Sequence, residues 1–421
     1  MKTAGEVRTA AASVKNIGWR VTFAGLGVNL ALGILYTWSV LSKGIPEAWG
    51  WTESDKSLPY SAACLTFCII MVLAGRMQDR IGPRIVATLG GVLVGIGMIL
   101  ASLTTSPMGF VAGFGIFAGA GIGFGYASAT PPAVKWFPAA KTGLIAGIVV
   151  SGFGLASVYA SPLAKALNTA YGTQKTMLIL GVLFLFVVVI LAQLLKAPPA
   201  GYRPQGSAPA PAAGSAAAMK KEDFTPKEVL ATAQFYLLWF MYACGAGAGL
   251  MIIAKLAVIA ELQAGIKLGY VLVAVLALGN GCGRVTAGVL SDKIGRKPTF
   301  VICFLLQAVL IMLLSKATTG SPLASVPALV VISALIGANY GANLSLFPSI
   351  TKDFYGLKNF GVNYGLVFTA WGVGGFMLAL GAGKVYDVYK TFSYAYYGAV
   401  ALLILAAMIT VVVKAPHHRA G

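Results

Sequence analysis

One arginine in this sequence stands in the middle of a hydrophobic run. Arg284 lies within the apolar segment 268–291, eight residues before the polar turn that begins at Asp292. At about 1.5 Å per helical residue, it lies about 12 Å from that turn, close to the midplane of a hydrocarbon layer about 30 Å thick. A charge at that depth is costly, so it should face a cavity or a partner and by default marks a transport path. The alternative is an arginine tied into a fixed ion pair within the helix bundle.

The chemistry that Arg284 offers is recognition of a carboxylate. The sequence has 12 Asp and Glu residues, and all of them fall in loops, tails or helix ends. Arg284 therefore has no carboxylate at its own depth, and a substrate carboxylate would supply one through two charge-assisted hydrogen bonds to the planar guanidinium. One cation suggests one carboxylate. Asn280, one helical turn away on the same face, could orient the guanidinium or the substrate.

The rest of the chain consists of hydrophobic runs long enough to cross a bilayer. Of the 421 residues, 58% are hydrophobic and 10% are charged, which predicts an all-α integral membrane protein with no soluble domain left over. We expect twelve spans, at about 17–42, 57–78, 85–104, 108–134, 141–164, 174–195, 230–257, 268–291, 297–316, 324–350, 359–384 and 391–413.

The net charge of +19 follows the gaps between these runs. The even-numbered gaps and the two termini carry 21 of the 31 Lys and Arg residues, and the odd-numbered gaps with their helix ends carry 9. By the positive-inside rule, both termini lie in the cytoplasm. The charge records topology and speaks against nucleic-acid binding. Compact loops and short tails favour a bacterial inner membrane, and the N-terminus predicts an uncleaved first helix.

The sequence predicts no cofactor, metal site or enzyme activity. All five cysteines lie in apolar runs and both histidines lie in the C-terminal tail, so neither a metal site nor a disulfide is expected. The glycine-rich segment 113–125 falls within a span, where close helix packing is a better interpretation than a dinucleotide loop. A G-x-x-x-x-G-K-[ST] motif is missing, so we expect transport driven by gradients. No catalytic cluster of Ser or Cys, His and acid lies at one depth.

Two matching loop motifs divide the chain. Gly75-Arg-Met-Gln-Asp79-Arg80-Ile-Gly82 follows the second run, and Gly288-Val-Leu-Ser-Asp292-Lys-Ile-Gly295 follows the eighth, 213 residues later. Two copies of G-x-x-x-D-[RK]-I-G in equivalent gaps predict two six-helix halves.

The predicted halves are residues 1–196 and 227–421. Between them, residues 197–226 are rich in Ala and Pro and predict a flexible cytoplasmic linker. Near its end, Thr225-Pro226-Lys-Glu228 fits a helix start, with Thr as N-cap and Glu three residues later.

The loop motifs resemble those of the major facilitator superfamily, and the resemblance covers essentially the whole chain. It implies the major facilitator fold, an all-α membrane protein with twelve transmembrane helices in two pseudo-symmetric six-helix halves. In that family the acidic residue of the loop and its basic neighbours help to lock one conformation, which implies a gating role for Asp79, Arg80, Asp292 and Arg296. The alternative is that these residues only satisfy the topology rule, which fits the arginines better than the aspartates.

The repeat also relates aromatic residues of the two halves. Tyr126 plus 213 is position 339, next to Tyr340, so two tyrosines occupy near-equivalent places. Aromatic walls could also come from Tyr36 and Trp38 in the first span and from Phe368 and Trp371 in the eleventh. For each aromatic residue, helix packing or a membrane-interface belt is the alternative.

Further motifs resemble one branch of that superfamily, the monocarboxylate porters and oxalate:formate antiporters. They are Tyr36-Thr-Trp38-Ser, Trp136-Phe137-Pro138 running into Gly143, Asn280-x-x-x-Arg284 and Phe347-Pro348-Ser349. The resemblance implies that Arg284 binds the substrate carboxylate. It also places the aromatic cage of the antiporter on Tyr36, Tyr126, Tyr340 and Phe368, with Leu344 as an apolar replacement.

Two differences from this branch limit the possible substrates and the possible proton route. The oxalate carrier pairs its arginine with a lysine whose position here is Trp371, so a dianion would meet one cation and a large ring, which argues against oxalate. The mammalian porters carry a lysine and an aspartate tied to proton coupling. The matching positions here are Trp38 and Asn280, so that proton route is absent.

We predict a secondary transporter that moves a small monocarboxylate, such as lactate or pyruvate, with a proton by alternating access. The proton would travel on the substrate or through a group near the outer end, such as Glu261 with Lys255 or Lys384. One alternative is a carboxylate exchanger of the oxalate:formate type, which needs no proton site. Another is a membrane sensor, although the sequence has no added signalling domain. We expect a monomer as the functional unit, in contact with the lipid bilayer.

Overall fold

The computed structural model describes residues 15–138, 141–199, 202, 204, 223–356 and 359–416. Within these residues, eleven helices are long and apolar enough to cross a membrane. One of them, α8 (Thr142–Ala192), has 51 residues and is broken at Gly172, where φ is 74° and ψ is 172°. It therefore contains two of the twelve predicted spans, because a left-handed glycine turns the chain back there. The described residues contain no strand, which confirms the predicted all-α fold.

The N-terminal half begins with a span that changes its helix type in the middle. Its elements are α2 (Gly18–Leu32), η1 (Gly33–Thr37), α3 (Trp38–Lys43), η2 (Glu47–Trp49), α4 (Glu53–Ile81), α5 (Pro83–Ser102), α6 (Pro107–Phe110), η3 (Val111–Ala118), α7 (Gly119–Val134) and α8. The 3-10 turn η1 carries Tyr36. It lies against α8, where a Cβ on Gly33 would stand 2.5 Å from the carbonyl oxygen of Phe153, so only glycine permits this approach.

The C-terminal half repeats the plan with six membrane-length helices in the described residues. Its elements are α9 (Pro226–Leu230), α10 (Ala233–Leu262), α11 (Gly269–Ile294), α12 (Arg296–Ser315), η5 (Pro322–Ala324), α13 (Val326–Tyr355), α14 (Phe360–Tyr389) and α15 (Ser393–Val412). Several of these helices run past the predicted apolar segments, because a helix continues into the polar interface beyond the hydrocarbon layer. The helix α10 ends at Leu262, past the predicted end at 257.

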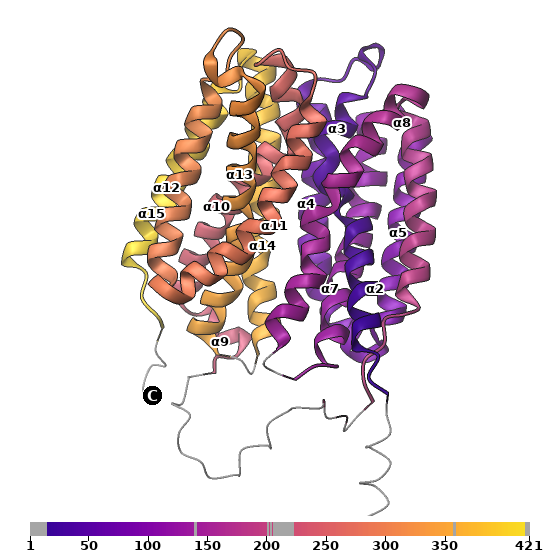
Figure 1. Cartoon of the computed structure of the whole chain (residues 1–421), viewed down its shortest axis with the longest axis vertical. Coiled ribbons are helices and arrows are strands. Elements are labelled where there is room, and N and C mark those ends of the chain that lie inside the picture. The colour runs from indigo at the N-terminus through magenta and orange to yellow at the C-terminus, as the bar shows by residue number, and fades with distance from the viewer. Residues whose placement is uncertain are drawn as a thin grey trace, which may run out of the picture.

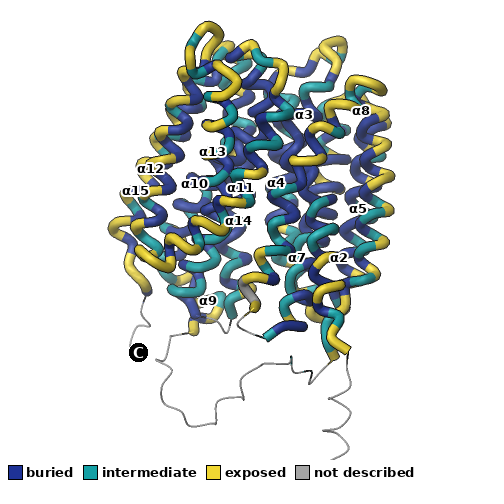
Figure 2. The backbone as a smooth tube through the Cα atoms, in the orientation of Figure 1, coloured by how far each residue is buried: buried dark blue, intermediate teal, exposed yellow. Residues whose placement is uncertain are grey.

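The two halves stand side by side, with the N-terminal half in indigo to magenta and the C-terminal half in orange to yellow (Figure 1). The start of α2, the short helix α9 and the end of α15 all lie at the same end of the molecule. We call this the inner end, following the predicted topology, and the opposite end the outer end. Buried backbone fills the interior, and exposed backbone follows the outward sides of α5, α12 and α15 (Figure 2).

Glycines set the closest helix contacts within each half. A Cβ on Gly113 would stand 2.5 Å from the carbonyl oxygen of Gly97, and one on Gly121 would stand 2.5 Å from that of Gly90. These contacts between the fourth span and α5 confirm that the glycine-rich segment serves helix packing. In the C-terminal half, α11 and α13 pack in the same way, since a Cβ on Gly283 would lie 2.0 Å from the carbonyl oxygen of Ala338.

The turns of the two loop motifs need their final glycines. Gly82 has φ 89° and Gly295 has φ 94°, and each is followed at once by the next helix, α5 or α12. A side chain is strained in this region of backbone space, so the glycine of the motif permits the turn. The predicted start of α9 is also confirmed, because Thr225 and Glu228 form a capping box. Most of the predicted linker 197–226 lies outside the described residues, as do residues 1–14.

Candidate functional site

Arg284 contacts both halves of the molecule. Its Nε donates a hydrogen bond to Oδ1 of Asn280, 3.1 Å away on the same helix α11. Its Nη1 donates to the carbonyl oxygen of Val150, 3.2 Å away on α8 in the N-terminal half. Arg284 is half-buried and Asn280 is fully buried. Asn280 therefore contacts the guanidinium, and its orienting role stays a prediction.

Two donors of this pair point toward one place on α8. A Cβ on Gly154 would lie 3.2 Å from Nη2 of Arg284 and 3.4 Å from Nδ2 of Asn280. The buried Nδ2 of Asn280 has no hydrogen-bond partner among the described residues. Glycine leaves this place free of a side chain, and an acceptor there would meet an amide and a guanidinium donor together. A carboxylate oxygen suits both donors, because charge-assisted hydrogen bonds to a carboxylate are the strong ones.

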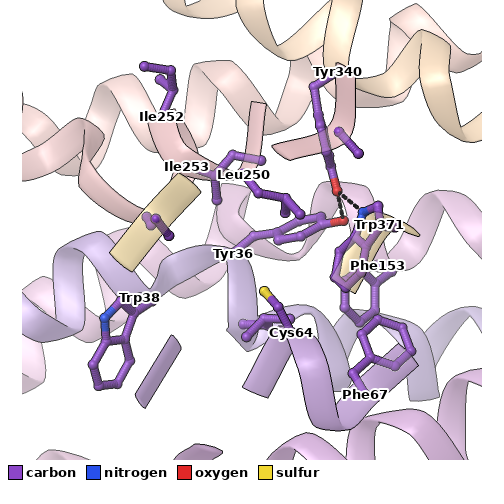
Figure 3. Close-up of a cluster of buried hydrophobic side chains, with 14 of the residues drawn as sticks. Tyr36, Trp38, Cys64, Phe67, Phe153, Leu250, Ile252, Ile253, Tyr340 and Trp371 are labelled. Atoms are coloured by element: carbon purple, nitrogen blue, oxygen red, sulfur yellow. Dashed lines mark hydrogen bonds between the residues drawn. The ribbon is translucent and has the colours of Figure 1, made fainter. Parts of the chain in front are cut away.

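Three aromatic side chains form a hydrogen-bonded chain across the halves beside this pair. The hydroxyl groups of Tyr36 on η1 and Tyr340 on α13 lie 2.5 Å apart. The indole Nε1 of Trp371 on α14 donates to the hydroxyl of Tyr340 at 2.8 Å. Figure 3 shows both bonds meeting at the Tyr340 hydroxyl. All three residues are buried, so the chain satisfies polar atoms that would otherwise be unpaired.

An aromatic cluster surrounds these three side chains, and two of its members, Phe153 and Phe67, were not predicted from the sequence. Phe153 on α8 lies edge-on to Tyr36 at 4.9 Å and to Tyr126 at 5.3 Å between ring centroids. Phe67 on α4 lies 5.1 Å from Trp371 and 5.4 Å from Tyr126. The repeat holds a signal for Phe67, because residue 67 plus 213 is position 280. For Phe153 we find no comparable signal.

The structure brings most of the predicted substrate-binding residues together. The rings of Tyr36 and Tyr340 lie 5.7 Å apart between centroids, and Phe153 contacts both Tyr36 and Tyr126. A Cβ on Gly341, next to Tyr340, would lie 2.9 Å from Oδ1 of Asn280, which the guanidinium of Arg284 contacts. Phe368 stacks on Trp371 with 5.3 Å between the ring centroids.

Two further candidates lie at the edge of this group or outside it. Leu344 lies one turn after Tyr340 on α13 and is half-buried. Trp38 lies away from the Tyr36–Tyr340 pair (Figure 3). Its ring packs on Phe114 and its Nε1 donates to the carbonyl oxygen of Lys56. Trp38 is therefore a packing residue and not a wall of this site.

The outer end is closed by ion pairs between the halves. Lys255 on α10 lies 2.7 Å from the carboxylate of Glu53 on α4, and Glu53 and Lys255 are 8% and 2% exposed. Asp387 on α14 accepts hydrogen bonds from the backbone N–H groups of Glu53 and Ser54, which begin α4. We call Glu53, Lys255 and Asp387 the outer gate. A carboxylate at a helix N-terminus is favourable because unpaired N–H groups and the helix dipole meet it there.

The expected pairing of Glu261 with Lys255 or Lys384 is wrong. Glu261 lies 2.6 Å from Lys43, at the end of α3, and Lys255 is taken by Glu53. Lys255 and Glu261 are six residues apart on α10, which places them on different faces of a helix with 3.6 residues per turn. Each residue therefore meets a different element of the N-terminal half.

The loop-motif residues at the inner end make contacts within their own halves. Arg296 binds Asp292 at 2.7 Å and Asp353, at the end of α13, at 3.1 Å. Asp79 is exposed and lies 3.9 Å from Lys135, and Arg80 is exposed. The gating role of Asp79, Arg80, Asp292 and Arg296 stays a prediction. Residues 139–140, between the motif residues Pro138 and Gly143, lie outside the described ranges.

Comparisons with known proteins agree with this architecture. The chain is 28% identical over 358 residues to the uncharacterized MFS-type transporter YhjX of Escherichia coli, covering 85% of each chain. It is 27% identical over 340 residues to the oxalate:formate antiporter of Oxalobacter formigenes, covering 80% of this chain and 77% of the antiporter. It is also 27% identical over 353 residues to apicoplast pyruvate carrier 1 of Toxoplasma gondii, covering 71% of this chain and 63% of the carrier.

The fold also matches a solved structure and a family model. A bacterial homolog to the human lysosomal transporter Spinster, solved in an inward-facing and unoccupied conformation, superposes with a TM-score of 0.69 at 16% identity. The match covers 94% of this chain and 97% of that chain. The model of the Major Facilitator Superfamily matches residues 21–275 and 238–421. The described residues contain eleven membrane-length helices, one of which is broken into two spans at Gly172. With this architecture and the match along the chain, the protein belongs to the major facilitator superfamily of membrane transporters.

Proposed function

We propose that this protein transports a small monocarboxylate, of the lactate or pyruvate kind, together with a proton by alternating access. The observation that carries the proposal is the pair of donors from Arg284 and Asn280 that converge beside Gly154. The pair offers one full positive charge, which matches one carboxylate. Its position near the contact between the halves suits a site that opens first to one side and then to the other.

The neutral surroundings of Arg284 favour a monoanion. Trp371, at the position where the oxalate carrier has a lysine, contributes an indole that is already bonded to Tyr340. A second carboxylate would therefore meet aromatic rings and no second cation, and an unpaired charge is costly in such a place. The similarity to a pyruvate carrier supports the same class of substrate, and the similarity to an oxalate:formate antiporter supports a carboxylate in general.

The contacts between the halves support an inward-open arrangement in the proposed cycle. Two ion pairs join the halves at the outer end, Glu53 with Lys255 and Lys43 with Glu261, whereas the pairs described for the loop motifs stay within one half. An anion that reaches Arg284 would replace the Val150 carbonyl as its acceptor. That exchange changes the bond between the halves and gives substrate a way to shift the conformational equilibrium.

The membrane location forms part of the same proposal. We place the protein in a bacterial inner membrane, as a monomer with both termini in the cytoplasm. The lysine-rich and arginine-rich loops at the inner end support this orientation through the positive-inside rule.

A second candidate function is obligate exchange of carboxylates. The presence of Asn280 where the mammalian porters have an aspartate favours it, because an amide cannot carry a proton. The similarity to the oxalate:formate antiporter points the same way. In an exchanger, the substrate-loaded protein changes readily between its inward-open and outward-open states, and the empty protein does not.

Uptake of labelled L-lactate into proteoliposomes tests both functions. For symport we expect accumulation in substrate-free vesicles when an inward proton gradient is applied, and loss of accumulation with Arg284→Gln. Uptake that needs unlabelled carboxylate inside the vesicles, and ignores the pH gradient, would establish exchange. Absence of uptake under both conditions, with lactate, pyruvate and formate, would refute the carboxylate proposal.

A further inference from the structure

A second group of cations lies at the outer end, away from Arg284. A cavity of about 70 Å³ opens between the halves there. Its lining includes Lys43 from α3 and Lys165 and Asn168 from α8, and from the other half Lys267 and Tyr270. The two halves thus contribute three lysines to one small cavity. At about 14 Å³ for one water-sized volume, the cavity holds a molecule of about five non-hydrogen atoms.

The cavity lies above the central site along the same two helices. Asn168 is 18 residues from Val150 on α8, with no left-handed break between them, and Tyr270 is 14 residues from Arg284 on α11. At about 1.5 Å per residue, the cavity is about 21–27 Å outward of the guanidinium. It is therefore a separate place from the Arg284 site, at the mouth through which an external anion would enter.

The charges of the cavity favour an anion. Lys165 and Lys267 are exposed and form no ion pair among the described residues. Lys43 already binds a carboxylate, that of Glu261 at 2.6 Å. Three lysines with one glutamate leave an excess of positive charge, and lysines from two sides attract an anion placed between them. The pairing of Lys43 with Glu261 shows that this position accepts a carboxylate.

One polar atom of the cavity lining is also unpaired. The amide nitrogen of Asn168 donates to the carbonyl oxygen of Val40 at 3.3 Å, but its buried Oδ1 has no hydrogen-bond partner among the described residues. A buried acceptor of this kind needs a donor. Because this oxygen is closed to water, a molecule in the cavity does not reach it, and the lysines alone carry the preference for an anion.

From these observations we propose that the outer cavity binds a small carboxylate and that its occupancy holds the outer end closed. A ligand that bridges lysines of both halves binds the closed outer end better than the open one. It therefore shifts the population toward that state. The identity of the anion rests on the proposed function, whereas the existence of the site does not.

Binding to the purified full-length chain in lipid nanodiscs tests the site without any need for transport. We would titrate sodium L-lactate into Arg284→Gln by calorimetry, with sodium chloride as the ionic-strength control. The expected result is a remaining weak isotherm that the added pair Lys165→Gln and Lys267→Gln weakens about fivefold or more. Lys175→Gln is the matched control, since it removes an exposed charge from α8 just beyond Gly172 without touching the cavity, and should change nothing.

Three results would overturn the proposal. One is no lactate binding to Arg284→Gln, and another is equal binding by the double lysine variant and the Lys175 control. The third is equal or tighter binding of inorganic phosphate, which would make the site a general anion site. Propionate, which keeps the carboxylate and lacks the hydroxyl group, should bind within a few-fold of lactate, and loss of its binding would contradict recognition through the carboxylate. A failed uptake assay alongside a positive titration would refute the proposed function and leave the site standing.

Labelling of a cysteine from the external side tests whether the ligand holds the outer end closed. Cys64 on α4 faces α14, where a Cβ on Gly375 would lie 3.3 Å from its Sγ. In proteoliposomes of Arg284→Gln with Cys64 as the remaining cysteine, external lactate should slow labelling by an impermeant thiol reagent. Unchanged or faster labelling would contradict the claim that occupancy holds the outer end closed.

Discussion

The guanidinium of Arg284 in the C-terminal half donates a hydrogen bond to the carbonyl oxygen of Val150 in the N-terminal half, 3.2 Å away. A neutral carbonyl is a weaker acceptor for a guanidinium than a carboxylate is. A carboxylate that reached Arg284 would therefore displace this carbonyl as the stronger acceptor.

Arg284→Lys should reduce lactate uptake about 10-fold to 100-fold, because an ammonium cannot form the two-pronged bond and each charged hydrogen bond contributes about 1.5–3 kcal/mol. Arg284→Gln should abolish uptake. Initial rates in proteoliposomes measure both effects. Lys316→Gln, which removes an exposed positive charge at the end of α12, outside the loop motifs, should keep near-normal rates. Full uptake by Arg284→Lys would remove the bidentate role.

Trp371→Lys should move the selectivity toward dicarboxylates. The new ammonium would add a second cation near Arg284, so we expect the affinity for oxalate relative to lactate to rise about tenfold or more. Competition of unlabelled oxalate against labelled lactate measures the change. Trp371→Phe keeps a ring but loses the donor to Tyr340, and should lower uptake by less than about tenfold without any gain of oxalate binding. If the lysine variant ignores oxalate, Trp371 does not set the charge preference.

Glu53→Gln should open the outer end by leaving Lys255 buried without its carboxylate. Removing one partner of a buried ion pair costs about 3–5 kcal/mol. Opening of the outer end lowers this cost, because water then hydrates the ammonium group of Lys255. Labelling of Cys64 by an external impermeant thiol reagent should therefore accelerate about tenfold or more in a chain with alanine at the other four cysteines.

Two variants show whether the pair between the halves is responsible. Glu53→Gln with Lys255→Met should label more slowly than Glu53→Gln alone, since neither charge is then left unpaired. Lys56→Gln removes the other cation near Glu53, which belongs to the same half, and should leave labelling near the starting rate. Equal rates for all these variants would mean that the outer gate does not hold the end closed.

Gly283→Ala should separate α11 from α13 and disturb the Arg284 site. A Cβ there would stand 2.0 Å from the backbone oxygen of Ala338, which cannot move without the whole helix. We expect a loss of about 1–3 kcal/mol of stability and a raised KM for lactate. Gly288→Ala, on the same helix with nothing within 4 Å of its Cβ, should be near neutral. Thermal unfolding in nanodiscs and uptake kinetics compare the pair, and equal behaviour would show that the helices adjust freely.

The parts of this protein that could be predicted from the sequence are those that break the hydrophobic background. Arg284 and Asn280 stand out within an apolar run, and the loop glycines Gly82 and Gly295 recur at a fixed offset. In a membrane protein, charged residues are restricted to loops, helix ends and cavities, and left-handed glycines are restricted to turns. Their positions in the sequence therefore indicate structure.

Other parts could not be predicted because they depend on helix rotation. Phe67 and Phe153 look like any other aromatic residue in a span, and only the packing of α4 and α8 shows that they face Tyr36 and Tyr126. Lys255 could not be matched with Glu53 because 202 residues separate them and α10 runs past the predicted end of its span. Sequence spacing shows which residues share a face of one helix, but it does not show how that helix is rotated relative to its neighbours.

The contact between α4 and α14 has a mechanical consequence. Gly372, Gly375 and Gly383 bring α14 against α4 along several turns, with backbone atoms of Cys64 and Glu53 close to the Cβ positions of Gly372 and Gly383. Side chains that interlock resist sliding, but a smooth strip of glycine does not. This strip can act as a bearing on which one half turns against the other. The resistance to turning then concentrates in the few polar bonds that cross the interface, where a substrate or a single substitution can reach it.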